Sequence, residues 1–235
     1  HRRVPSAFPR LEGALPLKAL VSPAAKDRQP AIAVTDTANL FGALEFSEKA
    51  ADAGIQPIVG CEMPVILDEA PARPGDEVRP HGVLVLIAAI EAGWRNLVRL
   101  VSRAYLGSGE RDGVVAVEER LIADLSDGII ALTGWRDGPV GRSIERGHPA
   151  EARARTERLA GIFGDRLYVE LQRHGLPGDP ALEAASVDIA YRLGLPLVAT
   201  NNAFFPSRED HEAHDALICV AEGVRLAEEE RRRLT

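Results

Sequence analysis

Apolar runs rich in Val and Ile recur along the chain, and helical patterns separate them. Six of these runs span residues 31–36, 57–67, 82–89, 128–134, 166–172 and 196–201, and the opening stretch at 1–4 gives a seventh candidate strand. The apolar character of the runs is continuous rather than alternating, which is typical of strands covered on both faces, as in parallel sheets. The pattern therefore predicts seven strands of a mainly parallel sheet.

Three of the segments between the runs carry apolar residues at the spacing of one helix face. The expected stripes are Leu40, Leu44, Ser47 and Ala51; Trp94, Leu97, Val98, Val101 and Tyr105; and Leu182, Ala185, Ile189 and Leu193. Asp179 and Pro180 suit the cap and first turn of the third helix. Ser207 with Asp210 resembles a capping box that opens a further helix at 208–222.

The repeated order of strand and helix predicts a parallel α/β architecture, either a closed barrel or an open sheet. No Gly-x-Gly-x-x-Gly segment or P-loop follows a strand, which argues against the nucleotide-binding open folds. We therefore favour an α/β fold built as a distorted seven-stranded (β/α)7 barrel with its helices outside. We expect it to form one domain over residues 1–235.

Polar residues occur where most of the predicted strands end. The residues at these ends are Asp36, Glu62, Trp135, Glu170, Gln172, His174, Asn201 and Asn202, all of them acids, amides or a histidine except Trp135. In a barrel of this kind, functional residues lie at the carboxyl ends of the strands, so these positions outline a polar mouth. Three of these residues also have a structural alternative: Asp36 suits a cap or a turn, Glu62 an ion pair and His174 an ordinary loop.

The net charge and the cysteine content exclude some classes of function. The net charge of −7 argues against a surface that grips nucleic acid by releasing counterions. Cys61 and Cys219 are too few for a disulfide framework or a zinc motif. His211 and His214 share one side of a helix but lack the zincin glutamate, so we expect a polar face there, either solvated or between domains.

The two ends of the chain and its hydropathy bear on whether it is part of a longer protein and whether it has a membrane helix. Residue 1 is not Met, and the last residues, LAEEERRRLT, have helical character, so we expect a segment of a longer chain whose last helix leads into the next domain. No apolar run approaches the roughly 20 residues of a membrane helix.

Six segments, taken in order, resemble the PHP (polymerase and histidinol phosphatase) domain of bacterial replicative DNA polymerase III α subunits. They are VTDTANLFGALEF, GIQPIVGCEMPV, GWRNLVRLVSRAYL, GIIALTG, YVELQRHGLPG and LPLVATNNAFFPSREDHEAHDALICVAEG. The resemblance covers nearly the whole chain. It implies the barrel fold and places the chain at the start of a DNA-directed DNA polymerase.

Family members that keep metals hold a trinuclear cluster in the barrel mouth. The resemblance places the ligand positions on Arg3, Pro5, Asp36, Thr37, Glu62, Trp135, His174, Asn202 and Phe204. Of these, Asp36, Glu62 and His174 can still ligate a metal. Arg3, if it points inward, would put a fixed positive charge where cations would lie. The resemblance therefore implies a vestigial metal site, with no bound metal and no catalytic residue in this segment.

A segment that keeps its barrel pattern but lacks its ligands is expected to be a structural and docking domain. The implied partners are the proofreading exonuclease subunit and the rest of a cytoplasmic polymerase chain, which would supply the Mg²⁺ chemistry and most of the DNA contacts. No membrane partner is expected. The alternatives are an active metal-dependent phosphoesterase or proofreading exonuclease of the same superfamily, and an unrelated α/β barrel enzyme that acts through Glu170 or His174.

Overall fold

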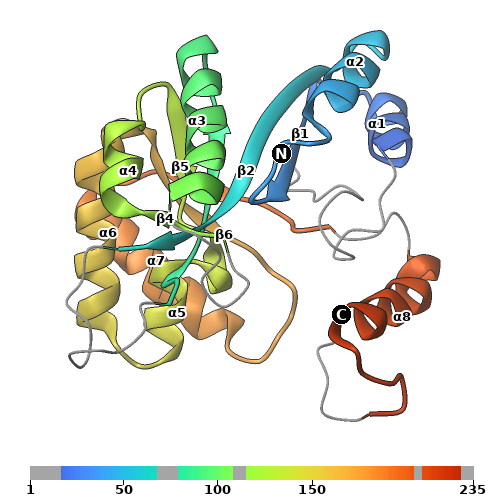
Figure 1. Ribbon diagram of the computed structural model, residues 1–235. Coiled ribbons are helices and arrows are strands. Elements are labelled where there is room, and N and C mark those ends of the chain that lie inside the picture. Colours follow the sequence, from blue (N-terminus) through green and yellow to red (C-terminus); the bar gives the residue numbers. More distant parts are fainter. Residues whose placement is uncertain (1–16, 68–78, 108–114, 204–207, 229–235) are drawn as a thin grey trace. The chain divides into compact units, whose positions relative to one another are not determined.

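The computed structural model describes residues 17–67, 79–107, 115–203 and 208–228 (Figure 1). The chain divides into two compact units, one formed by His1–Val59 with Asn201–Thr235 and the other by Gly60–Thr200. The expectation of a single domain over residues 1–235 stays a prediction. No described helix is both long and apolar enough to cross a lipid bilayer.

The first unit contains two helices around one strand and a further helix near the chain's end. α1 spans Leu17–Lys26, β1 spans Ala31–Thr37, α2 spans Ala43–Asp52, and the short 3-10 turn η3, Arg208–Asp210, leads into α8, His211–Glu222. Side chains of α1, β1 and α2 form one apolar cluster around the fully buried Phe46. Ser207, half of the expected capping box, lies outside the described residues.

The described strands form a seven-stranded sheet. The remaining strands are β2 (Gln56–Ile66), β3 (Gly82–Ala88), β4 (Val117–Glu118), β5 (Ile129–Leu132), β6 (Leu167–Leu171) and β7 (Leu197–Ala199). Their order is β1-β2-β3-β5-β6-β7, with β4 paired to β2. The α/β prediction with seven strands is confirmed, although the expected strand at 1–4 lies outside the described residues and β4 was not predicted.

The direction of β3 differs from the expectation of a parallel sheet. β3 is antiparallel to both of its neighbours, β2 and β5, whereas β5, β6 and β7 run parallel to one another. The reason is that a continuous apolar run reports only burial on both faces of the sheet, and burial is the same for either strand direction. β2 and β4 therefore run in the same direction as β5, β6 and β7, and β3 runs in the opposite direction.

The helices of the second unit pack against this sheet and against one another. They are α3 (Glu91–Gly107), α4 (Glu119–Asp124), α5 (Pro139–Glu145), α6 (Pro149–Phe163) and α7 (Asp179–Leu193), with the short 3-10 turns η1 (Trp135–Asp137) and η2 (Gly164–Arg166). α3 contacts β3 and β5, while α6 and α7 contact β6 (Figure 1). Leu84, Leu97, Ile129, Leu159 and Leu167 are buried in the core of this unit.

One of the three expected helix stripes is confirmed and two are wrong. In α7, Leu182 and Ile189 are buried as expected. In α2, the buried residues are Ala43, Phe46 and Ala50, and Leu44 is exposed. Both faces of α2 carry apolar residues at helical spacing, so the pattern allows either, and burying Phe46 removes more apolar surface from water.

In α3, the buried face is Gly93, Leu97, Leu100 and Ala104. A Cβ atom on Gly93 would lie 1.8 Å from the carbonyl oxygen of Gly128. Gly93 therefore allows α3 to pack closely against the backbone that precedes β5. This close contact determines which side of the helix faces the sheet. As a result, Trp94, Val98 and Tyr105 face outward instead of inward.

Candidate functional site

A closed cluster of polar side chains joins the carboxyl ends of β6 and β7. Glu170, in β6, is 0% exposed. Its Oε1 accepts hydrogen bonds from Nε2 of Gln172 at 3.0 Å and from the hydroxyl of Thr200. Nε2 of Gln172 also donates to Oγ1 of Thr200 at 3.1 Å. These three side chains therefore bond to one another in a site with little access to water.

The end of β5 joins the same cluster through its backbone contact with β6. The backbone N–H of Glu170 donates to Oγ1 of Thr133 at 3.0 Å, and Thr133 is itself buried. The ends of β5, β6 and β7 are adjacent because the three strands are parallel neighbours. We call the set Thr133, Glu170, Gln172 and Thr200 the strand-end cluster.

His174 extends the strand-end cluster toward the surface. Its Nε2 lies 2.8 Å from Oε1 of Gln172. Because an amide oxygen can only accept, Nε2 of His174 carries the proton and donates it. This nitrogen is committed to a hydrogen bond, and therefore is not presented as a metal ligand.

Arg136 and Asp179 hold the loop that carries His174. Nη2 of Arg136, in η1, lies 2.7 Å from Oδ1 of Asp179, and Nη1 of Arg136 bonds to Glu145 in α5. The other oxygen of Asp179 accepts the backbone N–H groups of His174 at 3.2 Å and Leu176 at 3.0 Å. A single buried carboxylate therefore fixes the path of the chain between β6 and α7.

These contacts determine the charge state of Asp179. Burial raises the pKa of its carboxyl, but the hydrogen bonds from Arg136, Leu176 and His174 together outweigh burial and hold the pKa below its usual range. Asp179 was expected to cap α7. The structure instead has Gly178 at the cap position, with no side-chain cap hydrogen bond, because the Asp179 carboxylate bonds to the preceding loop.

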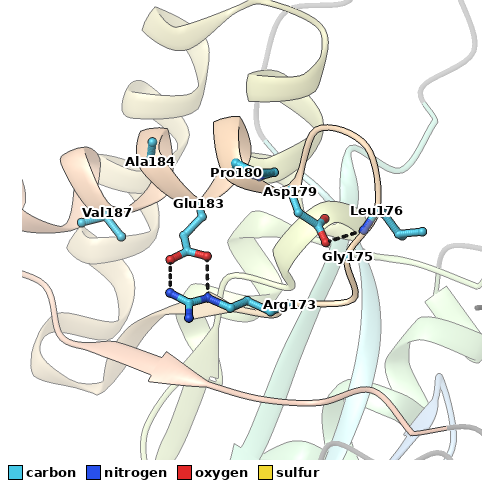
Figure 2. Close-up of a pocket in the computed structure, with 8 residues that line it drawn as sticks. All are labelled: Arg173, Gly175, Leu176, Asp179, Pro180, Glu183, Ala184 and Val187. Carbon is cyan, nitrogen blue, oxygen red and sulfur yellow. Dashed lines mark hydrogen bonds and ion pairs between the residues drawn. The ribbon is translucent and has the colours of Figure 1, made fainter.

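An open hollow of about 570 Å³ lies beside this loop at the start of α7 (Figure 2). Arg173 and Glu183 lie next to each other in its lining and are joined by two hydrogen bonds, Nε to Oε2 at 2.9 Å and Nη2 to Oε1 at 2.6 Å. The hydrogen bond from Arg173 holds the pKa of Glu183 below its usual range and outweighs burial, which raises it. The two charges neutralise each other, so the hollow offers an apolar surface with a satisfied ion pair.

Trp135 occupies the turn directly after β5, where the resemblance places a metal ligand. It is buried and has a positive φ of 52°, a backbone conformation that is uncommon for a bulky side chain. Its indole Nε1 has no hydrogen-bond partner within the described ranges. An indole N–H is a donor only, so this position cannot ligate a metal.

Glu62 does not lie at a strand end, in contrast to the sequence prediction. It sits inside β2, opposite Val85 of β3, and is buried. β2 continues to Ile66 because its apolar run extends past the glutamate. The sequence pattern could not show where within this run the polar mouth would lie.

The first unit holds the remaining described candidates. Asp36 is buried in β1, and Thr37 ends that strand, where its carbonyl accepts a hydrogen bond of 3.0 Å from Nδ2 of Asn39. In the described part of the chain, Oδ1 of Asn202 finds no hydrogen-bond partner. Arg3, Pro5 and Phe204 lie outside the described residues. His214 is buried, which excludes a solvated position for it.

Side chains that can ligate a metal are scattered over the described residues. Among the residues that the structure describes, no three His, Cys, Asp or Glu side chains gather closely enough to hold an ion. A catalytic zinc site commonly takes three protein ligands in suitable geometry. Within the second unit, the expected ligand positions are Glu62, Trp135 and His174, of which one is an indole and one has a committed nitrogen.

Sequence reasoning found Glu170, Gln172 and His174 but missed their partners. Thr133 and Thr200 are hydroxyl residues at the ends of two predicted strands, which is a signal that could have been used. Arg136 lies in a turn and meets Asp179 from 43 residues away along the chain, so no local pattern could reveal that contact.

Comparison with known proteins agrees with this fold. The PHP domain family model matches residues 1–174. The chain is 44% identical over its full length to DNA polymerase III subunit alpha of Caulobacter vibrioides, of which it covers 20%. Over 95% of the chain it is 34% identical to the same subunit of Pseudomonas fluorescens, of which it covers 18%. Over 94% of the chain it is 39% identical to an error-prone DNA polymerase of Symbiobacterium thermophilum, of which it covers 20%.

The chain thus spans about a fifth of the length of the curated relatives it matches. A solved structure of a Bifidobacterium adolescentis protein, assigned as a metal-dependent phosphoesterase, aligns with a TM-score of 0.50 at 12% identity, covering 88% of this chain and 87% of that one. At this identity the likeness concerns the fold alone. On the match of its sequence over residues 1–174, the chain belongs to the PHP domain family.

Proposed function

We propose that this chain is the PHP domain of a bacterial replicative DNA polymerase α chain and that it acts there as a non-catalytic structural and docking domain. Its partner is the proofreading exonuclease subunit. The observation that carries the proposal is the strand-end cluster, whose polar groups bond to one another instead of presenting ligands. The buried Trp135 at the end of β5 supports it, because an indole, which cannot ligate a metal, occupies a position where the family resemblance places a ligand.

The parent chain is proposed to be a cytoplasmic DNA-directed DNA polymerase. Relatives that carry this segment over about a fifth of their length are named DNA polymerases. Nucleotidyl transfer, its Mg²⁺ ions and the main DNA contacts belong to other parts of that chain. The net charge of −7 supports this division, since an acidic surface repels the DNA backbone.

The first test concerns metal content. We expect that purified protein, after dialysis against a weak chelator, holds far less than one equivalent of zinc or manganese, because Trp135 and the committed Nε2 of His174 leave too few donors. Elemental analysis by mass spectrometry measures this directly. Stoichiometric metal that is lost in His174→Ala would favour the alternative, an active phosphoesterase.

The second test concerns docking. We expect the full α chain to bind the exonuclease subunit in a saturable titration, and a polymerase lacking residues 1–235 to lose this binding by at least about a hundredfold, which corresponds to about 2.7 kcal/mol. Fluorescence anisotropy with labelled exonuclease measures both. The control is retained primer extension by the shortened polymerase, which shows that it is folded. Unchanged affinity after the deletion would rule the docking role out.

A further inference from the structure

Helix α7 carries a continuous apolar face on its outer side. It consists of Pro180, Ala184, Val187 and Tyr191. Their intervals of four, three and four residues place all of them on one face of the helix. Leu182 and Ile189, which are buried, lie on the opposite side. Val187 is half-buried, and the other three members of the set are exposed. We call this set the α7 face.

The two ends of the α7 face differ in shape. The hollow of about 570 Å³ lies at the start of the helix, and Pro180, Ala184 and Val187 line it (Figure 2). Tyr191, one turn beyond Val187, is 78% exposed and protrudes from the other end. Ala184 and Tyr191 are separated by about 10 Å along the helix axis, at a rise of about 1.5 Å per residue. One face of α7 therefore carries both a hollow and a projecting aromatic ring.

The lining of the hollow suits an aromatic ring. Leu176 and Pro180 supply apolar contacts, and Arg173 is part of the same lining. The Arg173 side chain keeps 81% of its surface exposed although it is bonded to Glu183. A planar guanidinium group attracts the face of a Tyr or Trp ring within about 6 Å. We therefore expect the hollow to accept an aromatic side chain.

The charges of α7 are neutralised within the chain. Each of its acidic residues bonds to an arginine, Asp179 to Arg136, Glu183 to Arg173 and Asp188 to Arg192. The whole chain has a net charge of −7, which makes two copies repel each other. The neutralised surface of α7 is therefore a place where two copies can meet without bringing unpaired like charges together.

We propose that two copies of this chain associate through the α7 face, with Tyr191 of each copy in the hollow of the other. A two-fold axis beside Val187, midway between Ala184 and Tyr191, makes the two helices antiparallel and fills both hollows at once. The hollow and the ring that fills it belong to the same face, so the contact is self-complementary. This inference is independent of the proposed docking role.

The contact is expected to be weak. It involves one helix of each copy, which is less than a standard protein interface, so we expect a dissociation constant on the order of tens of micromolar. The experiments therefore use the full α chain at concentrations above that value.

The first experiment is disulfide trapping. Val187→Cys places a thiol beside the proposed two-fold axis, where packed helices bring facing Cα atoms within the roughly 7 Å that a disulfide allows. After oxidation with copper phenanthroline in air, non-reducing gel electrophoresis is expected to show a covalent dimer. Ala181→Cys, on α7 but outside the α7 face, is the matched control and should give at most about a tenth as much dimer. Ala181 is more exposed than Val187, so random collisions would favour the control.

The second experiment follows association without cross-linking. Sedimentation equilibrium is expected to show that the α chain self-associates and that Tyr191→Ala weakens this association at least about tenfold. Tyr105→Ala, which removes an exposed tyrosine from α3, is the matched control and should stay within about twofold of wild type. Both changes concern exposed rings, so thermal unfolding of both variants should match wild type.

The outcomes decide the inference. Preferential cross-linking of Val187→Cys, together with weaker association of Tyr191→Ala, supports the two-fold contact. A wild-type chain that stays monomeric well above the expected dissociation constant overturns it, and so does equal cross-linking of the two cysteine variants. Self-association that Tyr191→Ala leaves unchanged also overturns it, because the copies would then meet elsewhere. Exonuclease binding is tested separately by the deletion of residues 1–235, so either idea can fail without the other.

Discussion

Replacing Gly134 with alanine is expected to lower the free energy of unfolding by about 3 kcal/mol or more. A Cβ atom at this position would lie 1.9 Å from the carbonyl oxygen of Val83 and 2.9 Å from Cα of Gly138. Both neighbours are backbone atoms, and Val83 belongs to a central strand that is paired on both sides. Gly134 also has a φ of +83°, which favours glycine. Urea unfolding followed by circular dichroism measures the loss.

Gly147→Ala is the matched control for this prediction. Gly147 has a similar φ of +75°, but a Cβ atom there would meet nothing within 4 Å. The loss of unfolding free energy in Gly147→Ala should therefore reflect backbone strain alone, on the order of 1–2 kcal/mol. If the two variants lost the same stability, the close approach of Gly134 to Val83 would not constrain the fold.

Removing the carboxylate of Glu170 is expected to cost about 2–4 kcal/mol of unfolding free energy in Glu170→Ala. The side chain is 0% exposed, and its loss would leave Nε2 of Gln172 and the hydroxyl of Thr200 without their shared acceptor. Glu170→Gln keeps the shape and one oxygen acceptor, so it should cost clearly less. Chemical unfolding curves of the three proteins provide the comparison.

A double-mutant cycle tests whether the strand-end cluster acts as a unit. Thr200→Val removes the hydroxyl that donates to Glu170 and accepts from Gln172. Combined with Glu170→Ala, it should cost less than the sum of the single changes, by about 1 kcal/mol or more. Simple additivity would mean that the two side chains contribute independently, and the cluster would then have no cooperative role.

The sequence by itself determined the positions of most strands and the start and end of α7. Continuous apolar runs at 31–36, 57–67, 82–89, 128–134, 166–172 and 196–201 all overlap observed strands. Apart from β7, whose residues are partly exposed, these strands are mostly buried, and burial on both faces demands apolar residues throughout. Pro180 in the first turn and Gly194, with φ +65°, after the last turn bound α7 through local backbone preferences. These features depend on neighbours in the chain, so they can be predicted from it.

Only the tertiary structure decided which way β3 runs and which sides of α2 and α3 are buried. An apolar run has the same residue pattern for either strand direction. A helix with apolar residues on two faces can pack either face against the sheet. In α3 the choice depends on Gly93 meeting the backbone of Gly128, a contact between distant residues that turns Trp94 and Tyr105 outward.

The same division holds for the candidate site. Glu170, Gln172 and His174 could be placed at a strand end from the sequence, because they follow an apolar run directly. Their hydrogen-bonding partners could not be predicted from the sequence. Those partners include Thr133 and Thr200 from neighbouring strands, and the loop that carries His174 is held by the contact of Arg136 with Asp179. Residue types state which hydrogen bonds a side chain can make. Packing alone decides which partners come within reach, and here it brought Glu170, Gln172 and Thr200 close enough to bond to one another.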